Sequence, residues 1–403
     1  MSQFTGAPIF DADQHMYETP DALTRYLPEE YESSIQFAQI GRHTRIVING
    51  VVTDYIPNPT FARVARPGAH EPYYAGNNPD GLTLQELMGR GIDCLDEFRN
   101  PEDRLPVLDE QGVRESFMFP TLANLVETSA EEDYHLVGEV IHALNRWMLE
   151  HWTFNYQNRI FASPVITCGT VEGAQREFEF AASNGAKIVL MKPAPAFGPH
   201  GWRSSALPEF DPLWRDIEAS GIPVALHASQ SPLEKYAAQW EPVKAKNAFA
   251  GSSFKTIVRG HRDIADMVTS LICHGTFTRF PKLKVMSVEN GSDWIGHLFD
   301  DFESLTTKNP KAFEEDPIEV FRRNMYVSPF WEGKVSDLVN LVGDDRILFG
   351  SDYPHPEGLA EPIGYYNYVD PMDVERTYDV MGDNSRRMIG LPTLNPHSGV
   401  RAA

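Results

Sequence analysis

The sequence predicts an α/β protein built as a (β/α)8 barrel, the TIM barrel, with an insertion after its first strand. Eight short apolar runs carry this prediction, and helical stretches alternate with them from about residue 110 onward. Most runs are continuous rather than alternating, which is typical of parallel strands buried on both faces. A doubly wound sheet would show the same alternation, so the count of eight is what favours a barrel. The runs are Pro8–Phe10, Arg114–Phe119, Ile160–Val165, Lys187–Met191, Pro223–Leu226, Leu283–Val288, Met325–Val327 and Arg346–Phe349.

Helices are expected between these runs. Each would follow its strand and return toward the opposite end of the barrel. The clearest helical stretches are Val171–Asn184, Asp211–Ser220, Asp263–Cys273 and Ser336–Val342.

Two regions do not belong to a minimal barrel. Residues 20–105 contain clusters of Pro, Gly and Asn, and we expect them to form an insertion that covers the mouth of the barrel. Within them, Thr44–Tyr55 alternates around Asn49-Gly50, which predicts a β-hairpin. Residues 391–403 are rich in Pro, Gly and Ser and are expected to be a weakly ordered tail. Residues 1–403 are otherwise expected to form a single domain.

Composition limits the classes of function. The chain has 403 residues, 42% of them hydrophobic, which is enough for a large core. Its formal net charge of −22 opposes binding to nucleic acid, whose partners concentrate Lys and Arg. We find no run of 18 apolar residues and no secretory signal pattern, and three cysteines are too few for a disulfide framework. The expectation is a cytoplasmic protein that binds a small molecule and neither a membrane nor nucleic acid.

Metal-binding residue types follow four of the predicted strands directly. In a barrel, side chains just beyond the strands' C-terminal ends face the active site. The first run leads into Asp13 and His15, which are two residues apart and so point to one face of an extended strand. Any one of these residues alone would more often have a structural role, but ligand types at four strand ends indicate a metal site. The expected ligands are Asp13, His15, His227, Glu289 and Asp352.

The expected ligand set contains two imidazoles and three carboxylates. A set so rich in oxygen shifts preference from zinc toward manganese, iron or magnesium, although zinc remains possible. The cofactor is therefore expected to be a divalent ion, Zn, Mn or Fe, with a pair of iron ions as a further possibility.

Four segments together resemble the amidohydrolase-2 branch of the amidohydrolase superfamily, which includes aminocarboxymuconate-semialdehyde and resorcylate decarboxylases. They are Asp13-Gln14-His15, Leu226-His227-Ala228, the run Arg279–Lys284 and the closing run Leu348–His355. The resemblance covers nearly the whole chain except the early insertion. It implies that Asp352 is both a ligand and a base, and that a homodimer is possible. Where the family often has a catalytic His after strand six, this chain has Glu289, which fits either a ligand or a base of different pKa.

The sequence leaves the roles of four further residues open. Glu18 fits an indirect or capping role better than direct ligation. His274 ends the helix before strand six and should lie far from the metal. His355 is a candidate acid–base residue on the loop after Asp352. Lys192 could be carbamylated to bridge two metals, could bind an acidic substrate, or could be a simple salt-bridged lysine.

The function predicted from these residues is that of a metal-dependent hydrolase or non-oxidative decarboxylase acting on a small organic acid, ester or amide. A metal-activated water and Asp352 as base would carry the chemistry, with Glu289 and His355 as further catalytic candidates. The alternative is a non-haem diiron monooxygenase, for which Glu289 would bind a second iron. A metal-containing binding protein is the weakest alternative. No nucleotide-binding glycine motif, serine-hydrolase elbow or zinc-finger spacing is present.

Overall fold

The computed structural model describes residues 7–41, 43–53, 55–241, 252–259, 261–329, 335–369 and 372–395. Seven parallel strands follow one another in chain order around a ring. Two ladders, β1-β7-β8 and β9-β12-β13-β14, are joined by a parallel bridge between Val165 and Leu190. Their bounds are β1 Ile9–Met16, β7 Val113–Pro120, β8 Ile160–Ala162, β9 Val189–Met191, β12 Val224–His227, β13 Val285–Val288 and β14 Met325–Val327.

Residues 347–353 close the barrel between β14 and β1. Ile347 forms a parallel bridge with Val327, and the backbone N–H of Ala12 donates to the Phe349 carbonyl at 2.7 Å. Asp352 N–H then donates to the Asp13 carbonyl, also at 2.7 Å. The eighth predicted strand, Arg346–Phe349, is thus in place but is no regular strand: Arg346 ends a 3-10 turn, and Ile347 pairs with β14 through a single isolated bridge.

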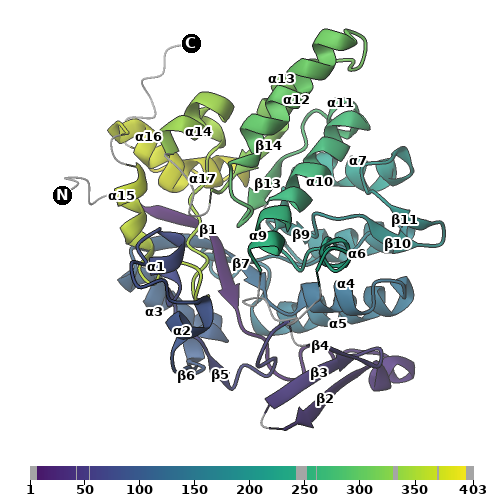
Figure 1. The fold of residues 1–403 in the computed structure, drawn as a ribbon, viewed down its shortest axis with the longest axis vertical. Coiled ribbons are helices and arrows are strands. Elements are labelled where there is room, and N and C mark those ends of the chain that lie inside the picture. Colours follow the sequence, from purple (N-terminus) through teal and green to yellow (C-terminus); the bar gives the residue numbers. More distant parts are fainter. Residues whose placement is uncertain are drawn as a thin grey trace.

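Helices cover the outside of the barrel and match the four expected positions to within a residue. In Figure 1, α4 to α7 and α10 to α13 lie to the right of β1, whereas α14, α16 and α17 lie above it and α15 lies beside its start. Their bounds are α4 Ala123–Ser129, α5 Tyr134–His151, α6 Val171–Ser183, α7 Asp211–Ser220, α8 Glu234–Ala237, α9 Ser253–Arg259, α10 Arg262–Cys273, α11 Thr276–Arg279, α12 Trp294–Lys308, α13 Pro317–Asn324, α14 Val335–Val342, α15 Tyr366–Val369, α16 Val374–Tyr378 and α17 Asn384–Met388. A short hairpin, β10 Ala196–Gly198 with β11 Gly201–Arg203, follows β9.

The insertion after β1 contains the predicted hairpin. β3 and β4 pair antiparallel across Asn49 and Gly50, whose φ angles of 50° and 75° are those of the expected turn. β2 adds a third strand, and this sheet lies beyond the arrowhead of β1 in Figure 1. The elements are β2 Ile35–Ile40, β3 His43–Ile48, β4 Val51–Thr53, β5 Arg63–Val64, α1 Glu71–Tyr74, α2 Leu84–Met88, β6 Ile92–Asp93 and α3 Pro101–Glu110.

The expected tail begins against the protein surface. Backbone N–H groups of Leu394 and Asn395 donate to the buried carboxylate of Asp383, both at 2.9 Å, whereas residues 396–403 lie outside the described part of the chain. Among the described residues, no helix combines the length and the apolar surface needed to cross a membrane. All three cysteines are free thiols.

Candidate metal centre

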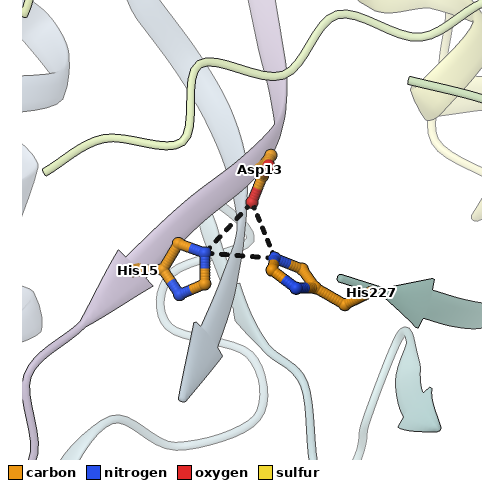
Figure 2. Close-up of side chains that lie close together, drawn as sticks. All are labelled: Asp13, His15 and His227. Carbon is orange, nitrogen blue, oxygen red and sulfur yellow. Dashed lines mark hydrogen bonds and ion pairs between the residues drawn. The ribbon is translucent and has the colours of Figure 1, made fainter. Parts of the chain in front are cut away.

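Three of the predicted ligands meet at the C-terminal ends of β1 and β12. Asp13 and His15 point from β1 toward His227 at the end of β12 (Figure 2). The Nε2 atoms of His15 and His227 are 3.1 Å apart. Asp13 Oδ1 lies 3.4 Å from Nε2 of His15 and 3.3 Å from Nε2 of His227. All three side chains are buried. The structure therefore brings together residues that are 212 positions apart in the sequence.

The hydrogen bonds of His227 favour a cation between these three groups. Its Nδ1 is 2.8 Å from the carbonyl oxygen of Ala228, which can only accept, so Nδ1 carries the proton. Its Nε2 then faces both the carboxylate of Asp13 and the imidazole of His15, and this nitrogen can bind a cation once it has given up its proton. A carbonyl that holds one imidazole nitrogen while the other binds metal is the usual arrangement of a ligating histidine. The three side chains thus fit a divalent ion.

Asp352 occupies the next position around the rim. Its Oδ1 is 3.3 Å from Nε2 of His15 and 2.8 Å from Nδ1 of His355. Its Oδ2 is buried and has no hydrogen-bond partner among the described residues. A buried carboxylate oxygen without a partner is costly, so a proton, a cation or a substrate group fits this place.

Glu289 points to the same centre from the end of β13. Its Oε2 lies 3.7 Å from Nδ1 of His227, and its φ of 56° is left-handed, as is that of Asp352. Non-glycine residues in this region are strained by about 1–3 kcal/mol each, and such strain concentrates at functional sites. The tight backbone after each strand aims both carboxylates toward the cluster.

Glu357 was missed by the sequence reasoning. Glu289, Asp352 and Glu357 each offer an oxygen within 4.8 Å of the others, and His15, Asp352 and His355 form a second such group. Glu357 follows Asp352 by five residues on the same loop, so the signal was its place in a closing segment already known to face the site. In total, four carboxylates and three imidazoles converge.

Burial and mutual charge set the proton affinities of this cluster. Burial and the neighbouring carboxylates hold the pKa of Asp352 and of Glu289 well above their usual range. Burial alone would lower the pKa of His227, but the charges of Asp13 and Glu289 raise it to about 9. Burial would raise the pKa of Asp13, yet the charge of His227 and hydrogen bonds from His15 and His227 lower it. Carboxylates this close together can all be ionised only when positive charge lies among them, so their convergence favours bound cations.

Two residues that we did not single out hold β1 in position. The buried carboxylate of Asp11 accepts from the hydroxyl of Ser351 at 2.5 Å and from Gln14 Nε2 at 2.9 Å. The buried guanidinium of Arg104, on α3, donates to Gln14 Oε1 and to the His15 carbonyl, both at 2.9 Å. The sequence around Arg104 does not predict this role, because the residues it contacts are 90 and 89 positions away along the chain.

The remaining sequence expectations have definite places. Glu18 Oε1 accepts from the backbone N–H groups of Thr121 and Leu122 at 2.8 and 2.7 Å, so it caps the start of α4 rather than joining the metal-binding groups. His274 is an exposed residue at the end of α10, hydrogen-bonded to Ser270, away from the centre as expected. The Lys192 amine donates to Thr128 Oγ1 at 2.7 Å.

The cluster opens onto a cavity of about 550 Å³. His15, His227, Glu289, His355 and Glu357 form one part of its wall. The insertion supplies much of the rest, with mainly apolar and aromatic side chains: Tyr55, Ile56, Pro57, Phe61, Val64, Tyr74 and Met88. A volume of this size is in the range that binds drug-sized ligands.

A parallel barrel with a metal-binding cluster at the C-terminal ends of its strands, open to a ligand-sized cavity, defines a metal-dependent barrel enzyme. Residues 92–391 match the sequence model of the family described as Amidohydrolase. The fold is shared with an amidohydrolase from Mycobacterium avium subsp. paratuberculosis, at a TM-score of 0.90 and 34% identity over 96% of this chain and 100% of that one. The chain belongs to this amidohydrolase family and is an enzyme of the amidohydrolase superfamily.

More distant relatives are decarboxylases. A 2-amino-3-carboxymuconate-6-semialdehyde decarboxylase from Dictyostelium discoideum is 24% identical over 194 residues, 46% of this chain and 49% of that protein. The match thus spans about half the length of this curated relative. A dihydroxybenzoic acid decarboxylase from Polaromonas, solved with bound manganese and the inhibitor 2-nitroresorcinol, shares the fold at a TM-score of 0.57. Its identity is 18%, over 83% of this chain and 96% of that one.

Proposed function

We propose that this chain is a metal-dependent hydrolase or non-oxidative decarboxylase that acts on an organic acid, ester or amide. The observation that carries the proposal is the position of Asp352. Its carboxylate has one oxygen beside the metal-binding imidazole of His15 and beside His355, and the other oxygen unpartnered. A base must be within reach of both the activated group and the substrate. Asp352 lies beside His15 and His355, and both of these line the cavity.

The residues divide the work between holding and proton transfer. Asp13, His15 and His227 would hold the ion. A divalent ion bound there supplies Lewis acidity and lowers the pKa of a bound water toward neutrality. Asp352 accepts a proton at Oδ2 and returns it to the leaving group or to the carbon that loses CO₂. His355, whose Nδ1 is 2.8 Å from Asp352 Oδ1, keeps that carboxylate oriented.

Asp352→Asn tests this assignment. The amide keeps the shape but cannot take up a proton, so turnover should fall by at least about 100-fold. A panel of aromatic and aliphatic acids, esters and amides is assayed for CO₂ release and for hydrolysis with manganese-loaded protein. The matched control is Asp80→Asn, at an exposed position far from these groups in sequence, which should leave turnover unchanged. An Asp352→Asn enzyme as active as the wild type would remove Asp352 from the mechanism.

A second candidate function, a diiron oxygenase, is favoured by one specific observation. Four carboxylates and three imidazoles exceed what one ion coordinates, and the group of Glu289, Asp352 and Glu357 is distinct from that of Asp13, His15 and His227. Carboxylate-rich sites with a few histidines are typical of two-iron proteins.

Metal counting and oxygen dependence separate the two candidates. The oxygenase requires two irons per chain, O₂ consumption with substrate, and a fall to one ion in both Glu289→Gln and Glu357→Gln. The hydrolase or decarboxylase requires turnover without O₂. One ion per chain in the wild type, with full activity under anaerobic conditions, would eliminate the oxygenase.

A further inference from the structure

Lys192 lies at the end of β9, on the wall of the same 550 Å³ cavity that the metal cluster faces. Its Nζ donates to Thr128 Oγ1 at 2.7 Å, which is the amine's one hydrogen bond to the described part of the chain. An ammonium group has three donors. The amine therefore keeps unused hydrogen-bonding capacity at the cavity wall.

The amine is separated from the metal cluster. The acidic groups whose charge it senses are Glu127, Glu131 and Asp263, and none of the four carboxylates of the cluster is among them. The bond to Thr128 directs it toward α4, on the opposite side of β9 from His227 in chain order around the barrel. This placement opposes a bridging carbamate role and favours contact with a part of the ligand remote from the metal.

No carboxylate within the described residues forms an ion pair with Lys192. Of the acidic groups that act on Lys192, Glu127 has the strongest electrostatic effect. Burial raises the pKa of Glu127 to about 7, so its carboxyl is only partly ionised near neutral pH. Glu131 forms an ion pair with Lys235 instead. Burying the Lys192 ammonium without a close anion costs desolvation free energy, and an anionic ligand would offset that cost.

Apolar side chains form much of the wall of the cavity that Lys192 and the metal cluster share. Met191, Leu190 and Ala123 line the barrel side, and Phe61 and Ile56 line the insertion side. The cavity is larger than a single substituted ring requires and suits a drug-sized body.

We propose that Lys192 is a specificity-determining residue that binds an anionic group, most simply a carboxylate, at the end of the substrate remote from the metal. The substrate is thereby a bulky, mainly apolar molecule with two polar ends: one that reacts at the metal and one that Lys192 holds. This inference rests on the proposed function, because it assumes that the metal holds the reacting end.

Binding of rigid aromatic carboxylates to the manganese-loaded protein tests the proposal. Three dicarboxylates of increasing length, terephthalate, naphthalene-2,6-dicarboxylate and biphenyl-4,4′-dicarboxylate, are each compared by calorimetry with the matching monocarboxylate. The metal anchors one carboxylate, so one dicarboxylate of suitable length should bind about tenfold or more tightly than its monocarboxylate, as expected for a hydrogen bond between charged groups. Lys192→Met should abolish this advantage and leave monocarboxylate binding unchanged, whereas Lys192→Arg should retain most of it.

Arg63 supplies the matched control. Its exposed guanidinium also lines the cavity but already pairs with Asp93 at 2.7 Å, so Arg63→Gln should keep the dicarboxylate advantage. The proposal is overturned if no dicarboxylate binds better than its monocarboxylate, if the advantage survives in Lys192→Met, or if Arg63→Gln removes it. Thermal unfolding of each variant verifies folding.

Metal content measured in the same samples keeps the two proposals apart. If the protein binds no metal, the proposed function fails, yet Lys192 is still tested. Its amine would then be the anchor for 2-naphthoate, and Lys192→Met should weaken that monocarboxylate about tenfold. Equal binding by the two proteins would overturn the role of Lys192 in that case as well.

Discussion

Gly350 allows the closing segment of the barrel to pass directly over Asp13, a proposed metal ligand. A Cβ at position 350 would lie 2.7 Å from Asp13 Cβ and 2.6 Å from Ser328 Oγ. Comfortable carbon–carbon contacts are about 3.5–4.0 Å, so Gly350→Ala creates an overlap of about 1 Å. Overpacking of this kind costs about 1–3 kcal/mol. Since Asp13 is one of the two groups that must move, part of that energy is expected to appear as a displaced ligand.

The expected consequence is weaker metal binding in a folded protein. Disturbance of the support of a metal ligand typically lowers affinity by about 10–100-fold. Competition of the protein with a fluorescent chelator for zinc or manganese measures this loss, and urea unfolding of the metal-free protein measures the strain. Gly296→Ala is the matched control: it lies in α12, where an added Cβ meets nothing within 4 Å. That variant should bind metal normally and be up to about 1 kcal/mol more stable. Wild-type metal affinity in Gly350→Ala would refute the account of how the closing segment positions Asp13.

Two further predictions concern stability. Arg104→Met should lower the free energy of unfolding by about 3–5 kcal/mol in urea titrations. The change removes the donor of two buried acceptors, the His15 carbonyl and Gln14 Oε1, and of the part-buried Glu97 carbonyl. A loss below about 1 kcal/mol would contradict the anchoring role. Burial raises the pKa of Glu127 from 4.5 to about 7. Between these two pH values the folded protein keeps a proton on Glu127 that the unfolded chain has lost, so the free energy of unfolding falls as the pH rises from about 4.5 to about 7. Urea titrations at pH 5 and pH 8 should show a smaller decline in Glu127→Gln than in the wild type, and identical declines would contradict this assignment.

The order of the barrel strands could be predicted from the sequence because each buried parallel strand is a short apolar run. Polar residues directly after such runs are conspicuous, and for this reason Asp13, His15, His227, Glu289 and Asp352 were all expected at one rim. The structure brings Asp13, His15 and His227 together, with Asp352 beside His15, whereas Glu289 groups with Asp352 and Glu357. That these side chains bind metal stays a prediction.

The contributions of the loops could not be predicted in the same way. Glu357 reaches the cluster only because the loop after Asp352 folds back over the barrel, and that path depends on contacts distant in sequence. One such contact is the backbone N–H of His70, which donates to the Pro356 carbonyl at 2.7 Å. Arg104 belongs to the same class, since α3 meets β1 through tertiary packing that no local pattern encodes. The left-handed backbone of Asp352 likewise depends on the fold, because its N–H is held by the Asp13 carbonyl of the first strand.

Metal content per chain decides whether Asp13, His15 and His227 form a metal centre. Elemental analysis is carried out on wild type, His227→Ala and His274→Ala, each purified without added metal. We expect at least one divalent transition-metal ion per chain in the wild type and in His274→Ala, because the His274 side chain is exposed at the end of α10. His227→Ala should lose most of it while remaining folded, because two ligands bind a borderline metal far more weakly than three. A metal-free wild type, or full occupancy in folded His227→Ala, would contradict the claim.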